Sequence, residues 1–388
     1  MIKDVALLSP IFVTFFWSLV FFIQPGEKDK PKIILGIFMV FAFLLYCSHA
    51  VYFNRSYALY SYIEPIYLFS MLVVYPLYYC YLVALTTERF IRKNTLLPFM
   101  PALLFSVLAL VLTFFLNHDD RILYVQEILV DRNMRKLNFN SLIGIKGIVF
   151  FISRIIFLIQ VAFFGIKGVQ LANRHNRKIE EYYSNIEGKT LNWVRLTSVI
   201  IIVTAIASII FTFIGRPYFS RNEVSLLVPS VIFSVFLFVI GLKGNHQIQV
   251  STDFEPEKNE TDFSEVKSKR LKNLLIQLFE NDKIYKDPEL RISVISEALN
   301  TNRTYISKLI NEEFQMNFNE FVNKYRIEEA KELLKANNSN LFTLDLIAEK
   351  SGFGSLNSFN RVFKTATGLT PGHFRNKNIN IFQKRVRT

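Results

Sequence analysis

The sequence predicts an all-α protein in two parts: a seven-helix transmembrane bundle, then a soluble all-α domain that contains two helix-turn-helix units. Three observations predict this architecture. Hydrophobic residues make up 51% of the 388 residues, and apolar stretches rich in Phe dominate residues 1–250. After that point the composition is that of an ordinary soluble protein. The C-terminal quarter then repeats a pattern of short amphipathic helices.

Seven apolar stretches are long enough to cross about 30 Å of hydrocarbon as helices. They are Val5–Ile23, Ile33–Tyr52, Ile63–Leu85, Leu96–Leu116, Leu142–Ile166, Leu196–Ile214 and Leu226–Leu242. No small-residue cleavage site follows the first stretch, and six further stretches come after it, so we expect a span and not a cleaved signal peptide.

The distribution of basic residues predicts how the spans are oriented. An odd number of spans places the two termini on opposite sides of the membrane. With the C-terminus inside, the inner segments between spans hold 12 Lys and Arg residues and the outer segments hold 8. Because inner loops are enriched in positive charge, we expect the N-terminus outside and the C-terminus in the cytoplasm. The abundance of Phe, Lys, Asn and Ile is typical of an AT-rich bacterial genome, so the expected membrane is the bacterial inner membrane.

Three residues that are charged at neutral pH, one each of Lys, Arg and Glu, lie within the predicted spans. Charge is costly there and is therefore a candidate for function. Arg154 lies in the middle of the fifth span, Lys146 near its outer end, and Glu64 at the start of the third. As an intramembrane sensor, Arg154 would face a polar cavity and pair with an acidic group or bind an anionic ligand. Alternatively Arg154 joins an interhelical pair or extends its charged end towards the membrane surface, and only holds the bundle together, which is the interpretation we favour. The tyrosines of the third span either pack against neighbours or line such a cavity.

The longest outer segment, Asn117 to Ser141, contains the apolar runs Ile122–Val125 and Ile128–Val130. It is either a sensor loop or a short helix on the outer membrane surface, or a connector that packs over the bundle. The two cysteines, Cys47 and Cys80, lie inside apolar runs and have no zinc-binding or disulfide spacing.

The chain divides into three segments. Residues 1–250 form the membrane domain, 251–263 an acidic flexible linker, and 264–388 the soluble domain. The linker has little apolar content and excess negative charge, which is typical of a hydrated tether. After it, apolar residues recur at helical spacing from Val266 to Phe279 and predict an amphipathic helix.

The first helix-turn-helix unit runs from Ile292 to Phe314. A short apolar helix precedes a turn at Asn300–Thr301, and Asn302 is a good N-cap for a second helix. The residues expected to face inward are Ile306, Leu309 and Ile310. Those left for the other side are Arg303, Thr304, Tyr305, Ser307 and Lys308.

The second unit runs from Thr343 to Phe363 and aligns with the first. Gly352 lies at its turn, where a positive φ is needed, and Ser355 caps the second helix. Phe359, Val362 and Phe363 are expected to face inward. The other side carries Leu356, Asn357, Ser358, Asn360, Arg361 and Lys364. A long helix from Asn319 to Ala336 would hold the two units about 34 Å apart, one turn of duplex DNA.

Residues Ile292 to Arg375 closely resemble the AraC-type DNA-binding domain. The match is densest in Ser358–Lys364 (SFNRVFK) and Gly368–Pro371 (GLTP), and Tyr325–Leu334 (YRIEEAKELL) is similar to the family's linker helix. One departure is Gln315, where the family usually has Gly after the first recognition helix.

The resemblance implies transcription regulation and two sets of residues that contact DNA. One groove would receive Arg303, Thr304, Tyr305, Ser307 and Lys308, and the next would receive Leu356, Asn357, Asn360, Arg361 and Lys364. Arg and Lys can read guanine and Asn can read adenine, while other members of the set would touch only phosphate.

Together these features predict a membrane-integrated one-component transcription regulator that couples a membrane or external signal to sequence-specific DNA binding. The expected partners are double-stranded DNA, the lipid bilayer, RNA polymerase, a second copy of the chain and an unknown small-molecule or membrane signal. We expect no cofactor, metal site or catalytic site, because the spans lack HExxH, paired Asp and Ser/His arrangements. The alternatives are a membrane transporter or enzyme with a regulatory DNA-binding tail, or a regulator whose membrane part is only an anchor.

Overall fold

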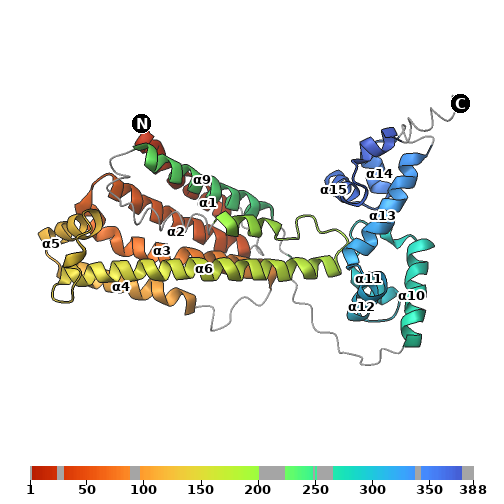
Figure 1. Cartoon of the computed structure of the whole chain (residues 1–388), viewed down its shortest axis with the longest axis horizontal. Coiled ribbons are helices and arrows are strands. Elements are labelled where there is room, and N and C mark those ends of the chain that lie inside the picture. Colours follow the sequence, from red (N-terminus) through yellow and green to blue (C-terminus); the bar gives the residue numbers. More distant parts are fainter. Residues whose placement is uncertain are drawn as a thin grey trace. The chain divides into compact units, whose positions relative to one another are not determined.

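The computed structural model describes residues 2–23, 30–87, 97–200, 223–247, 250, 265–336 and 342–377. These residues form helices joined by turns, with no β-strand among them, which agrees with the all-α prediction. They group into two compact units (Figure 1). The first comprises Met1–Arg174 and Leu191–Asp253, and the second comprises His175–Thr190 and Phe254–Thr388. The expected linker, 251–263, lies outside the described residues.

Six helices among the described residues are long and apolar enough to cross a membrane. They are α1 (Ile2–Ile23), α2 (Lys30–Phe53), α3 (Tyr57–Thr86), α4 (Met100–Phe115, preceded by the 3₁₀ turn η2, Leu97–Phe99), α6 (Leu142–Tyr182) and α9 (Glu223–His246). The expected span Leu196–Ile214 falls largely outside the described residues. The total of seven spans therefore stays a prediction.

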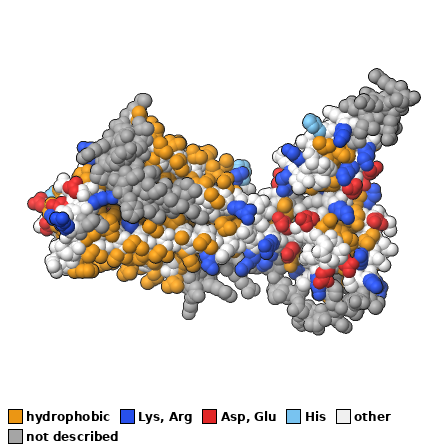
Figure 2. Space-filling model, viewed as in Figure 1, with side chains coloured by type: hydrophobic (Ala, Val, Ile, Leu, Met, Phe, Trp, Pro, Cys, Tyr) orange, Lys and Arg blue, Asp and Glu red, His pale blue; other side chains and the backbone are white. Residues whose placement is uncertain are grey.

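The outer faces of these helices carry large apolar side chains. Phe12 of α1, Phe114 of α4 and Ile159 of α6 are each more than 60% exposed. In Figure 2 hydrophobic side chains cover much of the visible surface of the first unit, whereas the second unit shows mixed charges. Continuous apolar surface of this kind is costly in water and suits contact with lipid.

Helix α6 is longer than the sequence pattern predicts. It continues without a break to Tyr182, whereas the apolar stretch ends at Ile166. At 41 residues it is about 60 Å long, roughly twice the hydrocarbon thickness of a bilayer. From His175 onward its last turns belong to the second unit.

The connector between α4 and α6 packs into the first unit. It forms α5 (His118–Leu123), which continues into the π-helical segment η3 (Tyr124–Val130). Tyr124, Val125, Ile128 and Leu129 are all buried among residues of α3, α4 and α6. The connector therefore packs over the bundle, as one of the two alternatives predicts, and a sensing role for it stays a prediction.

Among its described residues the second compact unit contains six named helices after α6, and residues 371–377 are also helical. The named helices are α10 (Glu265–Glu280), α11 (Ile292–Ala298), α12 (Arg303–Phe314), α13 (Phe318–Lys335), α14 (Leu344–Lys350) and α15 (Leu356–Thr367). Helix α13 contributes to two separate cores: Phe321 and Val322 pack with α10–α12, while Ile327, Ala330 and Leu334 pack with α14 and α15. Figure 1 shows α12 near one end of α13 and α14 and α15 near the other. The expected long helix between two helix-turn-helix units is thus confirmed.

Candidate functional site

The first helix-turn-helix unit is built as its sequence predicts. The Asn302 side chain accepts a hydrogen bond from the Tyr305 amide at 2.7 Å and so caps α12. The turn before it places Asn300 at φ +48°, a conformation that Asn tolerates better than most residues. Ile306, Leu309 and Ile310 are buried, which leaves Thr304 and Lys308 exposed and Arg303 and Ser307 half-exposed on the other side of α12.

Tyr305 does not lie where the sequence pattern places it. Its side chain is 6% exposed and packs in the core of the first helix-turn-helix unit with Phe279 and Leu309. The residue is in the first turn of α12, one position before the buried Ile306, so the apolar side of the helix is wide enough to include it. The expectation that Tyr305 faces away from the core is therefore wrong, and its ring is not available to a base.

The second helix-turn-helix unit repeats this construction with a tighter turn. Ser355 caps α15 by accepting a hydrogen bond from the Ser358 amide at 3.1 Å. At Gly352 φ is +87°, and a Cβ built there would lie 2.4 Å from the carbonyl oxygen of Tyr285. This position therefore requires glycine for two reasons, the backbone conformation and the close approach of another segment.

Replacing Gly352 with Ala is expected to lower the free energy of unfolding of the second helix-turn-helix unit by about 2–4 kcal/mol, because of backbone strain and the clash with Tyr285. Gly368→Ala is the matched control. Gly368 also has a positive φ, +75°, but nothing lies within 4 Å of its ideal Cβ, so only the strain, about 1 kcal/mol, is expected. Thermal unfolding of the full chain, monitored by proteolysis of its C-terminal part, measures both. Equal losses would show that the contact with Tyr285 does not matter.

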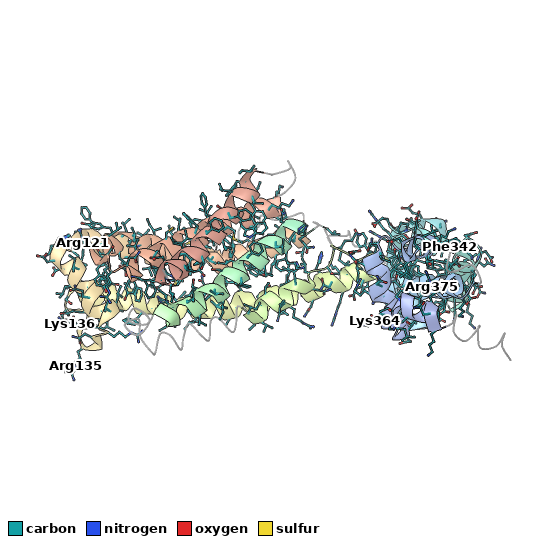
Figure 3. All side chains as sticks on the ribbon, turned by 90° about the horizontal axis from the view of Figure 1, so that it is seen from above. Arg121, Arg135, Lys136, Phe342, Lys364 and Arg375 are labelled. Atoms are coloured by element: carbon teal, nitrogen blue, oxygen red, sulfur yellow. The ribbon has the colours of Figure 1, made fainter. Side chains whose placement is uncertain are left out.

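The exposed side of α15 carries the residue types that read DNA. Phe359 and Phe363 are buried, while Asn357, Arg361 and Lys364 are exposed and Asn360 is half-exposed. Figure 3 labels Lys364 on this helix. Leu356 is half-buried against the second core, so it packs as well as facing outward.

The N-terminal end of helix α13, which follows the first helix-turn-helix unit, is fixed by a cap. Asn317 and Glu320 form a reciprocal capping box, with hydrogen bonds of 2.9 Å in both directions. Gln315, the departure from the AraC-type pattern, adopts the left-handed conformation with φ +54°. Gln therefore occupies the conformation that the family's glycine would favour. The 34 Å separation of the two units stays a prediction.

A buried arginine that the sequence analysis did not single out joins three segments of the second compact unit. Arg326 on α13 is 1% exposed. It donates hydrogen bonds to the carbonyl oxygens of Tyr285 (2.8 Å) and Asp287 (2.7 Å) and to the hydroxyl of Ser184 (3.0 Å). Burial lowers the pKa of Arg326 to about 10, although the carboxylates of Asp287 and Glu289 oppose this shift. The guanidinium therefore remains charged near neutral pH.

Ser184 belongs to a segment that we call the docking segment, residues 175–190. It comprises the last turns of α6 and the turn that follows. The Ser184 amide donates to the Leu290 carbonyl at 3.1 Å, and the Asn319 side chain donates to the Ser184 carbonyl at 2.6 Å. Asn185 and Lys189 both contact the Glu289 carboxylate, at 2.8 and 3.3 Å. The docking segment is thus held against the helix-turn-helix domain by several polar contacts.

Two of its contacts reach the first residues of the recognition helices. The Ser355 hydroxyl, the N-cap of α15, donates a hydrogen bond to the carboxylate of Glu187. The Arg303 guanidinium, at the start of α12, lies 5.9 Å from the centre of the Tyr182 ring. In helix-turn-helix proteins the N-terminal residues of the recognition helix contact base edges. The docking segment therefore lies close to both expected DNA-contacting sites.

Arg326→Met is expected to cost the second unit about 2–4 kcal/mol, because the Tyr285 and Asp287 carbonyls lose their buried donors. It should also release the docking segment, which would be cleaved faster by a protease in the region of 183–190. Lys324→Met removes an exposed charge from the same helix and is the control. Arg326→Lys should restore only part of the stability, since one ammonium cannot reproduce the guanidinium's geometry. Undiminished protection in Arg326→Met would refute the role of this contact.

The Glu289 contacts predict a pH dependence of docking. Burial opposes ionisation, but the hydrogen bond from Asn185 and the charge of Lys189 outweigh it and lower the pKa of Glu289. A carboxylate whose pKa is lower in the docked state stabilises docking above its ordinary pKa, and this contribution disappears as pH falls through the lowered value. Protease protection of 183–190 should therefore decrease in acid below about pH 4. Glu289→Gln should reduce that change, and an identical pH profile would contradict the assignment.

Two of the three intramembrane candidates form one buried ion pair. The Lys146 ammonium on α6 lies 2.9 Å from the Glu64 carboxylate on α3, and both side chains are 1% exposed. Lys146 also donates to the hydroxyl of Thr113 at 2.8 Å, and the Tyr124 hydroxyl donates to Glu64. Each charged group therefore has a neutral partner in addition to the opposite charge. Glu64 and Lys146 hold α3, α4, α6 and η3 together, which is a structural role.

Arg154 is in a different environment, half-buried in the middle of α6. It donates to the Tyr67 hydroxyl at 2.6 Å, and its guanidinium lies 5.1 Å from the Phe150 ring centre and 5.5 Å from the Tyr67 ring centre. Within the part of the chain that the structure describes, no carboxylate lies within ion-pairing distance of it. Among the described residues Arg154 therefore joins α6 to α3 through a hydrogen bond and not through an ion pair, and its role as a sensor stays a prediction.

Comparisons with known proteins agree with the C-terminal geometry. Residues 295–377 match the family model of a helix-turn-helix domain. The uncharacterized HTH-type transcriptional regulator YtdP of Bacillus subtilis is 33% identical over 89 residues, which are 23% of this chain and 11% of YtdP. The uncharacterized transcriptional regulatory protein YesN of the same organism is 37% identical over 82 residues, 21% of this chain and 22% of YesN. The chain thus spans about a tenth to a quarter of the length of the curated relatives it matches.

Solved structures are also similar to a part of the chain. The C-terminal domain of the two-component response regulator yesN from Fusobacterium nucleatum is 28% identical, with a TM-score of 0.24. The similarity covers 29% of this chain and 99% of that one.

Proposed function

We propose that this chain, whose C-terminal part is an AraC-type helix-turn-helix domain, is a membrane-integrated transcription regulator that binds double-stranded DNA. One observation carries the proposal: two capped recognition helices present Arg, Lys and Asn side chains on a chain that also contains six helices apolar enough to span a membrane. DNA lies in the cytoplasm, so the C-terminal domain is cytoplasmic and an odd number of spans places the N-terminus outside.

The outer sides of α12 and α15 provide the proposed DNA contacts. Lys308 and Arg361 are the exposed cations of the two helices best suited to guanine or phosphate, and Asn357 and Asn360 are suited to adenine. Held by α13, the two helices would enter successive major grooves on one face of the duplex. RNA polymerase and a second copy of the chain are further proposed partners, and two linked copies would bind DNA more tightly than one.

Selection of bound fragments from a random DNA library tests this binding directly. The full-length chain, purified in lipid nanodiscs, should enrich two sequence elements separated by about 10 base pairs. Enrichment of a single element would contradict the tandem arrangement. Recovery of fragments without any shared sequence would leave only electrostatic binding to DNA and would contradict specific regulation.

We also propose that the docking segment couples the membrane part to DNA binding. Helix α6 begins in the span region and ends in the docking segment, so a displacement of this helix changes the position of residues that contact Arg303 and Ser355. Glu187 places a negative charge beside the start of α15, where a DNA phosphate would also lie, so docking and DNA binding would compete. A signal that undocks the segment would then increase DNA binding.

Variants of the docking segment test this coupling. Glu187→Ala should raise the DNA affinity of the full-length chain in the absence of any signal. Glu181→Ala removes the same charge from the last turn of α6 and is the control. If both variants bind DNA as the parent chain does, docking is not inhibitory. Replacement of the spans by an unrelated anchor gives a separate test, because unchanged regulation would show that the membrane part only anchors.

A further inference from the structure

The core of the first unit contains a cavity that none of the proposed DNA contacts explains. Its volume is about 280 Å³, near the lower end of the range for small-molecule sites. Five membrane helices, α1, α2, α3, α6 and α9, line it, so it lies between helices and not on one face of the bundle. The end of η3 also contributes, through Ile128 and Leu129.

The lining is mainly apolar and aromatic, with a set of polar side chains among it. Leu7, Ala42, Met71, Val74 and Leu237 are among the apolar residues. The polar residues are two arginines, Arg132 and Arg154, together with His49, Ser230 and five tyrosines. No Asp or Glu is among the described residues that line the cavity. The described wall therefore offers positive charge and hydrogen-bond donors, and no carboxylate to balance a positively charged ligand.

Arg154 is held in place on this wall. Tyr67 accepts one of its hydrogen bonds at 2.6 Å, and the rings of Tyr67 and Phe150 contact its guanidinium. The His49 ring lies 5.4 Å from the Tyr67 ring and supports it from α2. The Tyr67 hydroxyl accepts a hydrogen bond from only one of the five N–H donors of the Arg154 guanidinium. The remaining donors of Arg154 therefore have no carboxylate partner among the described residues.

An arginine at this depth is costly unless an anion or a polar network compensates its charge. The planar guanidinium matches a carboxylate through two parallel hydrogen bonds, which makes a carboxylate the best single partner. The remaining lining favours an apolar group attached to that carboxylate. These features together define one class of ligand.

We propose that the cavity binds an amphiphilic monocarboxylate, with its carboxylate on Arg154 and its hydrocarbon part among the apolar residues of α1, α2 and α9. The inference rests on the proposed function only where it gives this ligand a signalling role. Binding shifts the packing of α6 against α2 and α3, and α6 continues into the docking segment. The ligand would enter from the bilayer or from the outer side.

Equilibrium binding of radiolabelled laurate to the full-length chain in lipid nanodiscs tests the assignment, with empty nanodiscs subtracted. Binding should saturate, and Arg154→Gln should weaken it by about 10- to 100-fold, the effect of losing one charge-assisted hydrogen-bonded contact. The laurate affinity of Arg154→Lys should lie between those of the parent chain and Arg154→Gln, because lysine keeps the positive charge but lacks the two parallel N–H donors of the guanidinium. Arg135→Gln, which changes an exposed arginine of the connector (Figure 3), should bind as the parent chain does.

Competition on the unmodified chain decides the question even where Arg154→Gln fails to fold. Unlabelled laurate should displace the label, and dodecanol and dodecyltrimethylammonium should do so at least 10 times less well. Equal competition by dodecanol would show that the cavity recognises only hydrocarbon and would overturn the proposal. Stronger competition by dodecyl phosphate than by laurate would overturn the choice of carboxylate. A laurate with a photoreactive group in its hydrocarbon part should crosslink to the cavity-lining residues of α1, α2 and α9. Labelling confined to lipid-facing residues would also overturn the proposal.

These measurements contain no DNA, so they are independent of the proposed function. Saturable laurate binding in a chain that shows no specific DNA binding would support the ligand site and contradict the regulator. Specific DNA binding without saturable laurate binding would contradict the ligand site alone.

Discussion

Replacing Lys308 and Arg361 together with alanine is expected to weaken specific DNA binding by about 2–6 kcal/mol, or roughly 30- to 25,000-fold. The two residues are exposed on different recognition helices, α12 and α15, so their contributions should be nearly additive. A contact to a base should also relax sequence preference at its position, whereas a contact to phosphate should weaken all sequences equally. Fluorescence anisotropy with selected and scrambled duplexes at several salt concentrations measures both effects.

Lys269→Ala with Arg270→Ala is the matched control for this pair. It also removes one Lys and one Arg from exposed positions of the same unit, but on α10, which has no proposed DNA contact. The control should lose only the general electrostatic attraction, which salt screens. Equal losses in the two double variants would mean that α12 and α15 contribute charge but no recognition.

Lys146→Met is expected to lower the free energy of unfolding of the membrane unit by about 3–5 kcal/mol. The reason is that Glu64 would be left buried without its 2.9 Å partner, in the core between α3 and α6. Unfolding by sodium dodecyl sulfate in mixed micelles, followed by loss of helical signal, measures the change. Under conditions in which the variant remains folded, Lys146→Met should still bind laurate, because Glu64 and Lys146 do not line the cavity.

Two further variants separate the buried pair from charge in general. Combining Lys146→Met with Glu64→Gln should recover much of the loss, because no isolated charge then remains. Lys136→Met breaks the connector's ion pair with Glu127, in which Lys136 is well exposed, and should cost less than about 1 kcal/mol. A loss from Lys146→Met no larger than that from Lys136→Met would contradict the structural role of the buried pair.

Local sequence determined much of what could be predicted. The caps Asn302 and Ser355, the turn at Gly352 and the buried faces of α12 and α15 depend on residues within a few positions of one another. Apolar length alone likewise predicted the six described helices that are long and apolar enough to span a membrane. Tyr305 was misplaced because spacing shows which side of a helix is apolar but not how far that side extends.

Contacts between distant segments could not be predicted in the same way. The pair of Glu64 and Lys146 joins residues 82 positions apart (146 minus 64), and only the packing of α3 against α6 reveals it. The continuation of α6 beyond Ile166 follows polar residues whose periodicity does not distinguish a helix from a loop. The role of Arg326 depends on Ser184 and Tyr285, which a single sequence does not place beside it.

Genome-wide DNA occupancy of the full-length chain in living cells tests the central claim most directly. The parent chain, recovered in the membrane fraction, should occupy discrete sites that share one sequence. Those sites should vanish with Lys308→Ala and Arg361→Ala and persist with Lys269→Ala and Arg270→Ala. An absence of discrete sites under every growth condition, or sites unaffected by the Lys308 and Arg361 changes, would contradict a membrane-integrated regulator that reads DNA through α12 and α15.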